Sequence, residues 1–296
     1  MVRTPSKAEW MEPLGVEIFR GDLSLFSGPC DLPEVDVFIH LAAIVGGAKD
    51  QREYFRINHQ AVADLLESLK RQPWAPKRLV FASSLAAAGP SEVGSPWTED
   101  DTLAPIDDYG RAKRDAEKLL VNAPFPVTAF RPPIVLGPGD SATLPLYQAA
   151  RRGVGMRVAG QAPQQLSFVY VSDLVDAIVR MAMDDRPGFR AYFTPHDDEI
   201  TVVDLWQALG RSVGSKVRLA PVPKSALWAA MQAMSMGAKV LPFHNPLDRK
   251  QYEQIIRPAF VCSNGKLKSE LGWAPEVALA EATQKSAEGY KELGWI

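Results

Sequence analysis

Cysteine is scarce in this chain, which has only Cys30 and Cys262 among its 296 residues. Two cysteines give no disulfide framework, so a reducing cytoplasm is the expected compartment. The four histidines are scattered without the spacing of a metal site, and no Gly-x-Ser-x-Gly motif is present. Metal-dependent chemistry and acyl transfer through a serine elbow are therefore set aside.

The sequence also lacks long hydrophobic runs and an excess of positive charge. No uncharged apolar stretch approaches the roughly 20 residues that span a bilayer, and the segment MVRTPSKAEW has no signal-peptide core. The formal net charge of −2 gives no basic surface for nucleic acid. Since 46% of the residues are hydrophobic, the chain suits one large α/β unit with a lobe, or two domains.

Short apolar runs alternate with amphipathic segments through the first half of the chain. Strands are expected at residues 16–19, 35–40, 78–82 and 126–130, and helices at residues 58–69 and from Asp107 or Asp108 onward. Strands that alternate with helices predict a doubly wound parallel sheet.

The region around residues 78–120 carries the clearest chemistry. The apolar run 79–82 ends on Ser83 and Ser84, and the carboxyl ends of strands are where open α/β sheets bind ligands. On the following helix Tyr109 and Lys113 share a face at a spacing of four. An ammonium beside a phenol lowers the phenol pKa, so this tyrosine is predicted to exchange a proton with an alcohol. The alternative is that Tyr109 packs on the sheet and Lys113 is solvated.

These residues resemble those of the extended short-chain dehydrogenase/reductases, also called the NAD-dependent epimerase/dehydratase family. The matching motifs follow in the family's order: His40-Leu41-Ala42-Ala43, Asn58, SSLAAAG from Ser83, YGRAK from Tyr109, Arg131-Pro132-Pro133, FVYVSDLVDAI from Phe168 and ELGWAP from Glu270. The resemblance covers nearly the whole chain and implies a Rossmann-like sheet with a smaller, mostly helical substrate lobe. The expected division is residues 1–143 and 166–190 for the dinucleotide-binding domain, and 144–165 and 191–296 for the lobe.

The resemblance also implies roles for single residues. Tyr109 would be the acid/base, Lys113 would lower its pKa and bind the nicotinamide ribose, and Ser84 would orient the substrate oxygen. Asn58 would position Lys113 through its backbone or a water, although a helix N-cap is its plain alternative.

The implied cofactor is NAD or NADP. Its further contacts would be Asp22 and Leu23 at the adenine, Leu41, Ala42 and Ala43 at the pyrophosphate and ribose, and Pro132 at the nicotinamide. Arg3 would meet a 2′-phosphate and favour NADP, or it is a solvated terminal charge; Asp22 is equally compatible with a turn.

A glycine-rich phosphate loop is missing from this pattern. No G-x-G-x-x-G occurs among the 21 glycines, although dinucleotide folds hold the pyrophosphate on such a turn. Residues 1–3 resemble the tail of the second strand, so the first strand, loop and helix are expected upstream. A misassigned start is favoured over a fragment or a degenerate copy.

Two departures from the family bear on the substrate. Leu85 and Ala86 replace the Asp-Glu pair of the sugar dehydratases, which argues against loss of water. Residues 164–167 lack the arginine with which nucleotide-sugar epimerases grip a diphosphate, unless Arg151, Arg152 or Arg157 compensates.

A segment rich in Trp and Met, residues 225–241, has Leu227, Met231, Met234, Ala238 and Leu241 on one helical face. A core-packing helix is the favoured interpretation. The sharper one is the wall of an apolar substrate site or a peripheral membrane contact.

The sequence therefore predicts an NAD(P)-dependent oxidoreductase that transfers hydride at a secondary alcohol or ketone of a small molecule. A hydroxysteroid-like or other apolar substrate is slightly favoured. The alternatives are a nucleotide-sugar epimerase and a cofactor-poor, non-catalytic binding protein. A homodimer through the helices at Asn58 and Tyr109 is expected from the resemblance alone.

Overall fold

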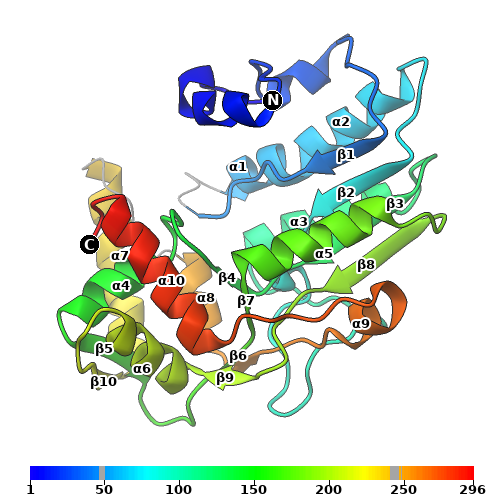
Figure 1. The fold of residues 1–296 in the computed structure, drawn as a ribbon. Coiled ribbons are helices and arrows are strands. Elements are labelled where there is room, and N and C mark those ends of the chain that lie inside the picture. Colours follow the sequence, from blue (N-terminus) through cyan, green and yellow to red (C-terminus); the bar gives the residue numbers. More distant parts are fainter. Residues whose placement is uncertain (47–50, 241–246, 248) are drawn as a thin grey trace.

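The computed structural model describes residues 1–46, 51–240, 247 and 249–296. Its centre is a four-stranded sheet in the order β1-β2-β3-β8, with every neighbouring pair parallel (Figure 1). The strands are β1 (Val37–His40), β2 (Arg78–Ala82), β3 (Val127–Arg131) and β8 (Phe189–Phe193). A mixed α/β fold with a parallel central sheet was predicted, and the structure confirms it.

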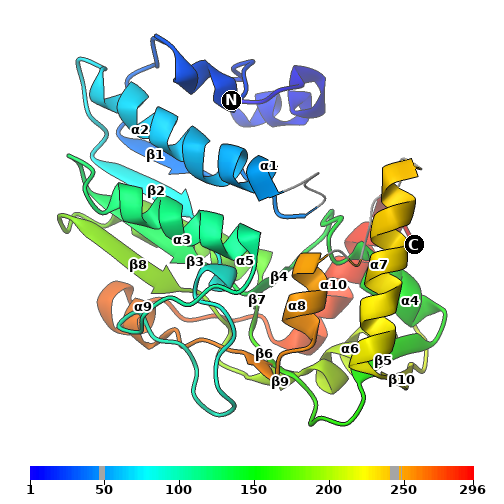
Figure 2. The ribbon, with the colours of Figure 1, turned by 180° about the vertical axis from the view of Figure 1, so that it is seen from behind.

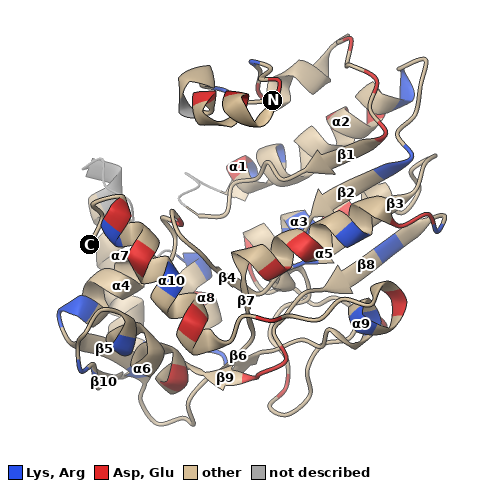
Figure 3. Cartoon of the chain, viewed as in Figure 1, with Lys and Arg blue, Asp and Glu red and all other residues tan. Residues whose placement is uncertain are grey.

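Helices cover both faces of this sheet. α2 (Ala61–Lys70) and α3 (Asp108–Leu120) lie on one face, and α5 (Val171–Met183) lies on the other (Figures 1 and 2). Successive side chains of a strand point to opposite faces, so Leu79 and Phe81 join the core beneath α2 and α3, whereas Val80 joins the core beneath α5. Charged residues follow the outer face of α5, where Asp176 and Arg180 pair at 2.8 Å (Figure 3).

The remaining elements form a lobe beside the carboxyl edge of the sheet (Figure 1). Its own core gathers Tyr147, Trp206 and Tyr290 with residues of the neighbouring helices. The helices are α4 (Leu144–Arg151), α6 (Val202–Ser212), α7 (Lys224–Val240), α8 (Arg249–Ile255) and α10 (Leu279–Glu292). The strands are β4 (Ile134–Leu136), β5 (Val154–Val158), β6 (Gln165–Leu166), β7 (Phe168–Tyr170), β9 (Ile200–Thr201), β10 (Arg218–Val222) and β11 (Ala259–Phe260).

Two elements link the lobe sequence to the main sheet. β8 pairs with β3 and so crosses the expected boundary at residue 190. Beyond the lobe helices, α9 (Gly265–Leu271) and Trp273 return to the core beneath α5. The two-lobe division of the chain remains a prediction.

Residues 16–19 do not form the predicted strand. A strand needs a partner along its length, and among the described residues the only bridge in this segment joins Arg20 to Val2. The segment around it instead forms short 3₁₀ helices at Pro5–Lys7, Glu9–Leu14 and Leu23–Ser27. The predicted helix at residues 58–69 is present but begins earlier, as α1 (Gln51–Phe55), a π-helical turn (Arg56–Gln60) and α2.

His40 closes β1 with a buried imidazole. Its ring stacks on Phe81 with centroids 5.9 Å apart, and its Nε2 atom is buried without a hydrogen-bond partner among the described residues. Burial lowers the pKa of His40 to about 4, and the nearby Lys113 charge acts in the same direction. The folded chain therefore holds this imidazole neutral.

His40 is expected to make stability fall on acidification. Below the ordinary histidine pKa of about 6.5, His40 binds a proton in the unfolded chain. In the folded chain it stays neutral until the pH falls to about 4. Between pH 7.5 and 5 this costs about 2 kcal/mol of unfolding free energy. Urea unfolding at the two pH values is expected to show the loss, and His40→Phe is expected to reduce it by that amount. The half-buried His59 gives the control, His59→Phe; an equal reduction in the control contradicts the assignment.

Candidate active site

Ser84 lies at the carboxyl end of the central sheet, directly after β2. Its Oγ accepts a hydrogen bond from the Ala86 backbone N–H at 3.1 Å and so caps a short 3₁₀ turn, Leu85–Ala87. The same hydroxyl lies near the phenol of Tyr109 and acts to lower its pKa. The structure therefore brings together the serine and the tyrosine that the sequence singles out.

The first turn of α3 is pressed against the Ser84 turn. Asp107 caps the helix by accepting a 2.7 Å hydrogen bond from the Gly110 N–H. At Gly110 a Cβ atom would lie 2.1 Å from the Ala86 carbonyl oxygen, so only glycine permits this approach. Gly110 therefore sets the distance between Tyr109 and Ser84, a role that the sequence pattern does not reveal.

Tyr109 is buried, with only 5% of its surface exposed. Its ring meets Tyr54 edge-on at 6.1 Å between centroids, and the Lys250 ammonium lies 4.5 Å from its centroid. Burial raises the pKa of Tyr109 to about 12; the Ser84 hydroxyl lowers it, and the Asp107 charge raises it further. The phenol is thus neutral and protonated at physiological pH in this structure.

Lys113 is also buried, so it is not a solvated helix residue. Its Nζ donates a 2.6 Å hydrogen bond to the Ala82 carbonyl and lies 5.0 Å from the Phe81 ring centroid. Burial lowers its pKa to about 7, against the opposing effect of Glu117. Burial is the largest influence on the pKa of Tyr109, and the Lys113 ammonium is held at the end of β2. The lowering of the Tyr109 pKa by Lys113 stays a prediction.

A buried ion pair lies beneath these groups. The Arg131 guanidinium donates two hydrogen bonds to Glu117, at 3.0 and 2.6 Å, and the Ser83 hydroxyl donates to the same carboxylate. Both charged side chains are less than a tenth exposed. The pair ties α3 to the ends of β2 and β3, and the sequence pattern did not single out Glu117.

The other predicted cofactor contacts are spread over two regions. Leu41 and Ala42 are exposed directly after β1, and the Pro132 carbonyl accepts from the Leu85 N–H beside Ser84. The Asn58 side chain bonds both the N–H and the C=O of Ile44, at 2.9 and 2.8 Å, and makes no N-cap.

At the N-terminal end, Asp22 caps the turn that begins at Leu23 by accepting from the Ser24 N–H at 2.8 Å. Arg3 is exposed, with its charge near Asp22. Asp22 is therefore a turn residue, which is the alternative that the sequence left open for it, and Leu23 is the first residue of the same turn.

The donor set at the sheet edge fits the nicotinamide-ribose half of a dinucleotide. The Tyr109 hydroxyl and the Lys113 ammonium lie at this edge. One of the three N–H donors of Lys113 bonds the Ala82 carbonyl. Next to them, the segment from Leu41 follows β1 with exposed side chains at Leu41 and Ala42. Among the described residues no glycine-rich turn opens a helix to hold the diphosphate.

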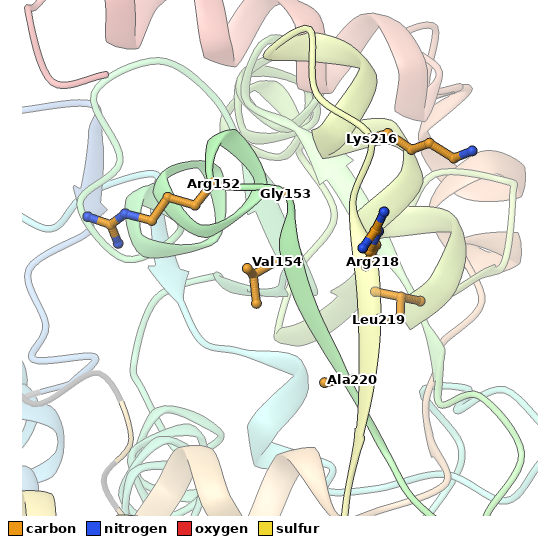
Figure 4. Close-up of a pocket in the computed structure, with 7 residues that line it drawn as sticks. All are labelled: Arg152, Gly153, Val154, Lys216, Arg218, Leu219 and Ala220. Carbon is orange, nitrogen blue, oxygen red and sulfur yellow. The ribbon is translucent and has the colours of Figure 1, made fainter.

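The three arginines proposed to grip a diphosphate lie in the lobe, at the end of α4 and in β5. Arg152 lines a shallow depression of about 560 Å³ on the β5–β10 ribbon, together with Lys216 and Arg218. In Figure 4 the Arg152 and Lys216 side chains extend in opposite directions. Gln164, in the segment 164–167 that lacks this arginine, donates to the Gln254 carbonyl at 2.8 Å. The departure from the nucleotide-sugar pattern therefore stands.

The described part of the chain lacks two features. No group of three or more His, Cys, Asp or Glu residues there is arranged to hold a metal ion. No helix among the described residues has the length and apolarity needed to cross a membrane.

Comparison with known proteins places the chain in a family. Residues 4–192 match the family model "NAD dependent epimerase/dehydratase family". Because the match covers more than half of the sequence, the chain belongs to this family, as its motifs predicted. The chain is 26% identical over 220 residues to UDP-glucose 4-epimerase of Vibrio cholerae, a match that covers 72% of this chain and 63% of that protein.

A second relative and a solved structure are similar to this chain over most of its length. Ceramide reductase of Caulobacter vibrioides is 22% identical over 295 residues, covering 99% of this chain and 86% of that protein. The structure of MoeE5 in complex with UDP-glucuronic acid and NAD has a TM-score of 0.71 at 22% identity, covering 93% of this chain and 85% of that one. At this identity the structural likeness concerns the fold.

The Glu117–Arg131 pair is expected to contribute strongly to stability. Glu117→Gln leaves a buried guanidinium without its counter-charge, which costs about 3 kcal/mol or more of unfolding free energy. Urea unfolding measures the loss. The exposed pair of Lys285 with Glu281, at 2.7 Å, gives the matched control: Glu281→Gln is expected to change stability by less than about 1 kcal/mol. Equal effects at the two sites contradict this account.

Proposed function

We propose that this chain is an NAD(P)-dependent oxidoreductase that transfers hydride at a secondary alcohol or ketone. The observation that carries the proposal is the meeting of Ser84 and Tyr109 at the carboxyl edge of the sheet, where the two turns that bear them are in close contact and Lys113 is buried beside them. Family membership supports the same chemistry.

Each of the three side chains has a distinct part in this reaction. Bound NAD(P)H supplies the hydride, with Lys113 and the backbone after β1 holding its ribose end. The protonated Tyr109 phenol gives its proton to the carbonyl oxygen, and Ser84 orients that oxygen by a hydrogen bond. Because Tyr109 is neutral in this buried setting, the arrangement favours reduction of a ketone.

An apolar substrate fits the surroundings of this site. Leu85 and Ala86 follow Ser84 where a dehydratase has carboxyl groups, and Gln164 is occupied in holding α8. The ceramide reductase relative points the same way.

α7 adds an apolar wall to the lobe. Leu227 and Met231 are buried, as the sequence pattern predicted, while Trp228 and Met236 are 50% and 68% exposed. The sequence has no charged residue between Lys224 and Lys239. The predicted positions Ala238 and Leu241 lie outside the described side chains. This exposed apolar face supports contact with an apolar substrate or with the surface of a membrane.

Nucleotide-sugar epimerisation is the second candidate, and the Vibrio cholerae relative is its support. The non-catalytic alternative draws on the missing phosphate loop. A homodimer through α2 and α3 and a cytoplasmic location remain part of the proposal.

Tyr109→Phe is expected to lower ketone reduction by a factor of about 100 to 10,000, because it removes the proton donor and keeps the ring. The measurement is NADPH or NADH oxidation with a 3-ketosteroid probe. Tyr170→Phe, at another buried tyrosine on β7, is the matched control and is expected to keep the rate. A Tyr109→Phe variant with wild-type turnover sinks the assignment.

The substrate class can be separated by ligand-induced stabilisation. A ligand at 100 times its dissociation constant adds about 2.7 kcal/mol to stability, a shift of several degrees in the unfolding temperature. In the presence of cofactor, the 3-ketosteroid is expected to raise this temperature and UDP-glucose to leave it unchanged. The opposite pattern favours the epimerase.

A further inference from the structure

The short helix α8 lies over the catalytic tyrosine, although the two are far apart in sequence. Lys250 places its Nζ 4.5 Å from the centroid of the Tyr109 ring. The same ammonium donates a 2.7 Å hydrogen bond to the Val45 carbonyl in the segment after β1. One side chain of the lobe therefore joins the loop after β1 to the phenol. Figure 2 shows α8 standing between α3 and α7.

Gln254 makes a second contact from the same face of α8. It is one helical turn beyond Lys250, a spacing that aligns two side chains. Its Nε2 donates a 2.8 Å hydrogen bond to Oδ2 of Asp107, whose other oxygen caps α3. Its backbone carbonyl accepts from Gln164. Two independent contacts thus turn this face of α8 toward the start of the catalytic helix.

We propose that α8 completes the active site and that Lys250 is a positioning residue for proton transfer by Tyr109. The inference rests on the proposed function and adds a residue to it. In ketone reduction, hydride passes from NAD(P)H to the carbonyl carbon while the carbonyl oxygen takes the proton of the Tyr109 hydroxyl. The cofactor is oxidised, the ketone becomes an alcohol, and a phenolate remains on Tyr109 until it regains a proton from water.

Lys250 favours that phenolate more than it favours the phenol. A cation over a neutral ring is attracted only to the ring quadrupole. Once the hydroxyl proton has left, the ring carries a full negative charge, and the attraction becomes that of an ion pair between a buried phenolate and a half-buried ammonium.

Among the described residues, the polar and charged groups that face Tyr109 come from several elements. Ser84 contacts the hydroxyl from the turn after β2, and Tyr54 meets the ring edge from α1. The Asp107 charge at the start of α3 opposes ionisation. Lys250, from α8, is the cation that lies on the ring face. Removing the Lys250 charge leaves Asp107 to act unopposed from that side.

Titration of Tyr109 in full-length protein containing 3-fluorotyrosine tests this role by ¹⁹F NMR. The Tyr109 resonance is identified by its loss in Tyr109→Phe. The ring fluorine lowers the phenol pKa and so brings the titration toward the pH range in which the protein is folded. Lys250→Met is expected to raise the Tyr109 pKa by about one unit, equal to a tenfold shift in ionisation. Lys250→Arg restores the charge and is expected to titrate close to wild type. Arg249→Met removes the neighbouring exposed charge on α8 and is expected to change nothing.

Kinetics with the 3-ketosteroid probe and NADPH add a second readout. Lys250→Met is expected to lower kcat about tenfold, with KM little changed and recovery in Lys250→Arg. If Lys250→Met does not fold, Lys250→Gln takes its place. An unchanged Tyr109 titration, an effect on KM alone, or an equal shift in Arg249→Met overturns the proposal. Wild-type turnover by Tyr109→Phe sinks the proposed function instead, whatever the titration shows.

Discussion

The contact between the first turn of α3 and the turn after β2 is the constraint on which the site depends. Ala86 and Gly110 meet so closely that a single added carbon would overlap the Ala86 carbonyl. This contact sets Tyr109 beside Ser84, and the Asp107 cap fixes where the helix begins. The Glu117–Arg131 pair holds the other end of the same arrangement, because it ties the last turn of α3 to the end of β3.

Burial determines the protonation states of the groups at this edge of the sheet. The same desolvation lowers the pKa of His40 and Lys113 and raises that of Tyr109. All three groups are thereby moved toward their neutral forms. Phe81 is central to this, since the His40 ring stacks on it and the Lys113 ammonium lies over it. A neutral phenol in such a setting can donate a proton, and nearby positive charge is needed to stabilise the phenolate that remains.

Local sequence signals predicted the parts of the site that local forces determine. The apolar run of β2, the N-cap at Asp107 and the helical spacing of Tyr109 and Lys113 each appear in the structure as expected. Lys250 and Gln254 carry no local signal toward Tyr109, because their contacts depend on how the lobe folds back. The direction of the Lys113 ammonium was missed for a similar reason, since the Ala82 carbonyl that accepts from it belongs to another element. Residues 16–19 have the composition of a strand but pair with no other strand among the described residues. The strand predicted from their pattern is therefore wrong.

The central claim is that this edge of the sheet holds a nicotinamide cofactor beside Tyr109. Isothermal titration of the 296-residue chain with NADH and with NADPH tests it most directly. The account predicts heat of binding from at least one of the two cofactors, with affinity reduced in Lys113→Met because the ribose loses a donor. Absence of heat with both cofactors, or equal affinity in the variant, contradicts it.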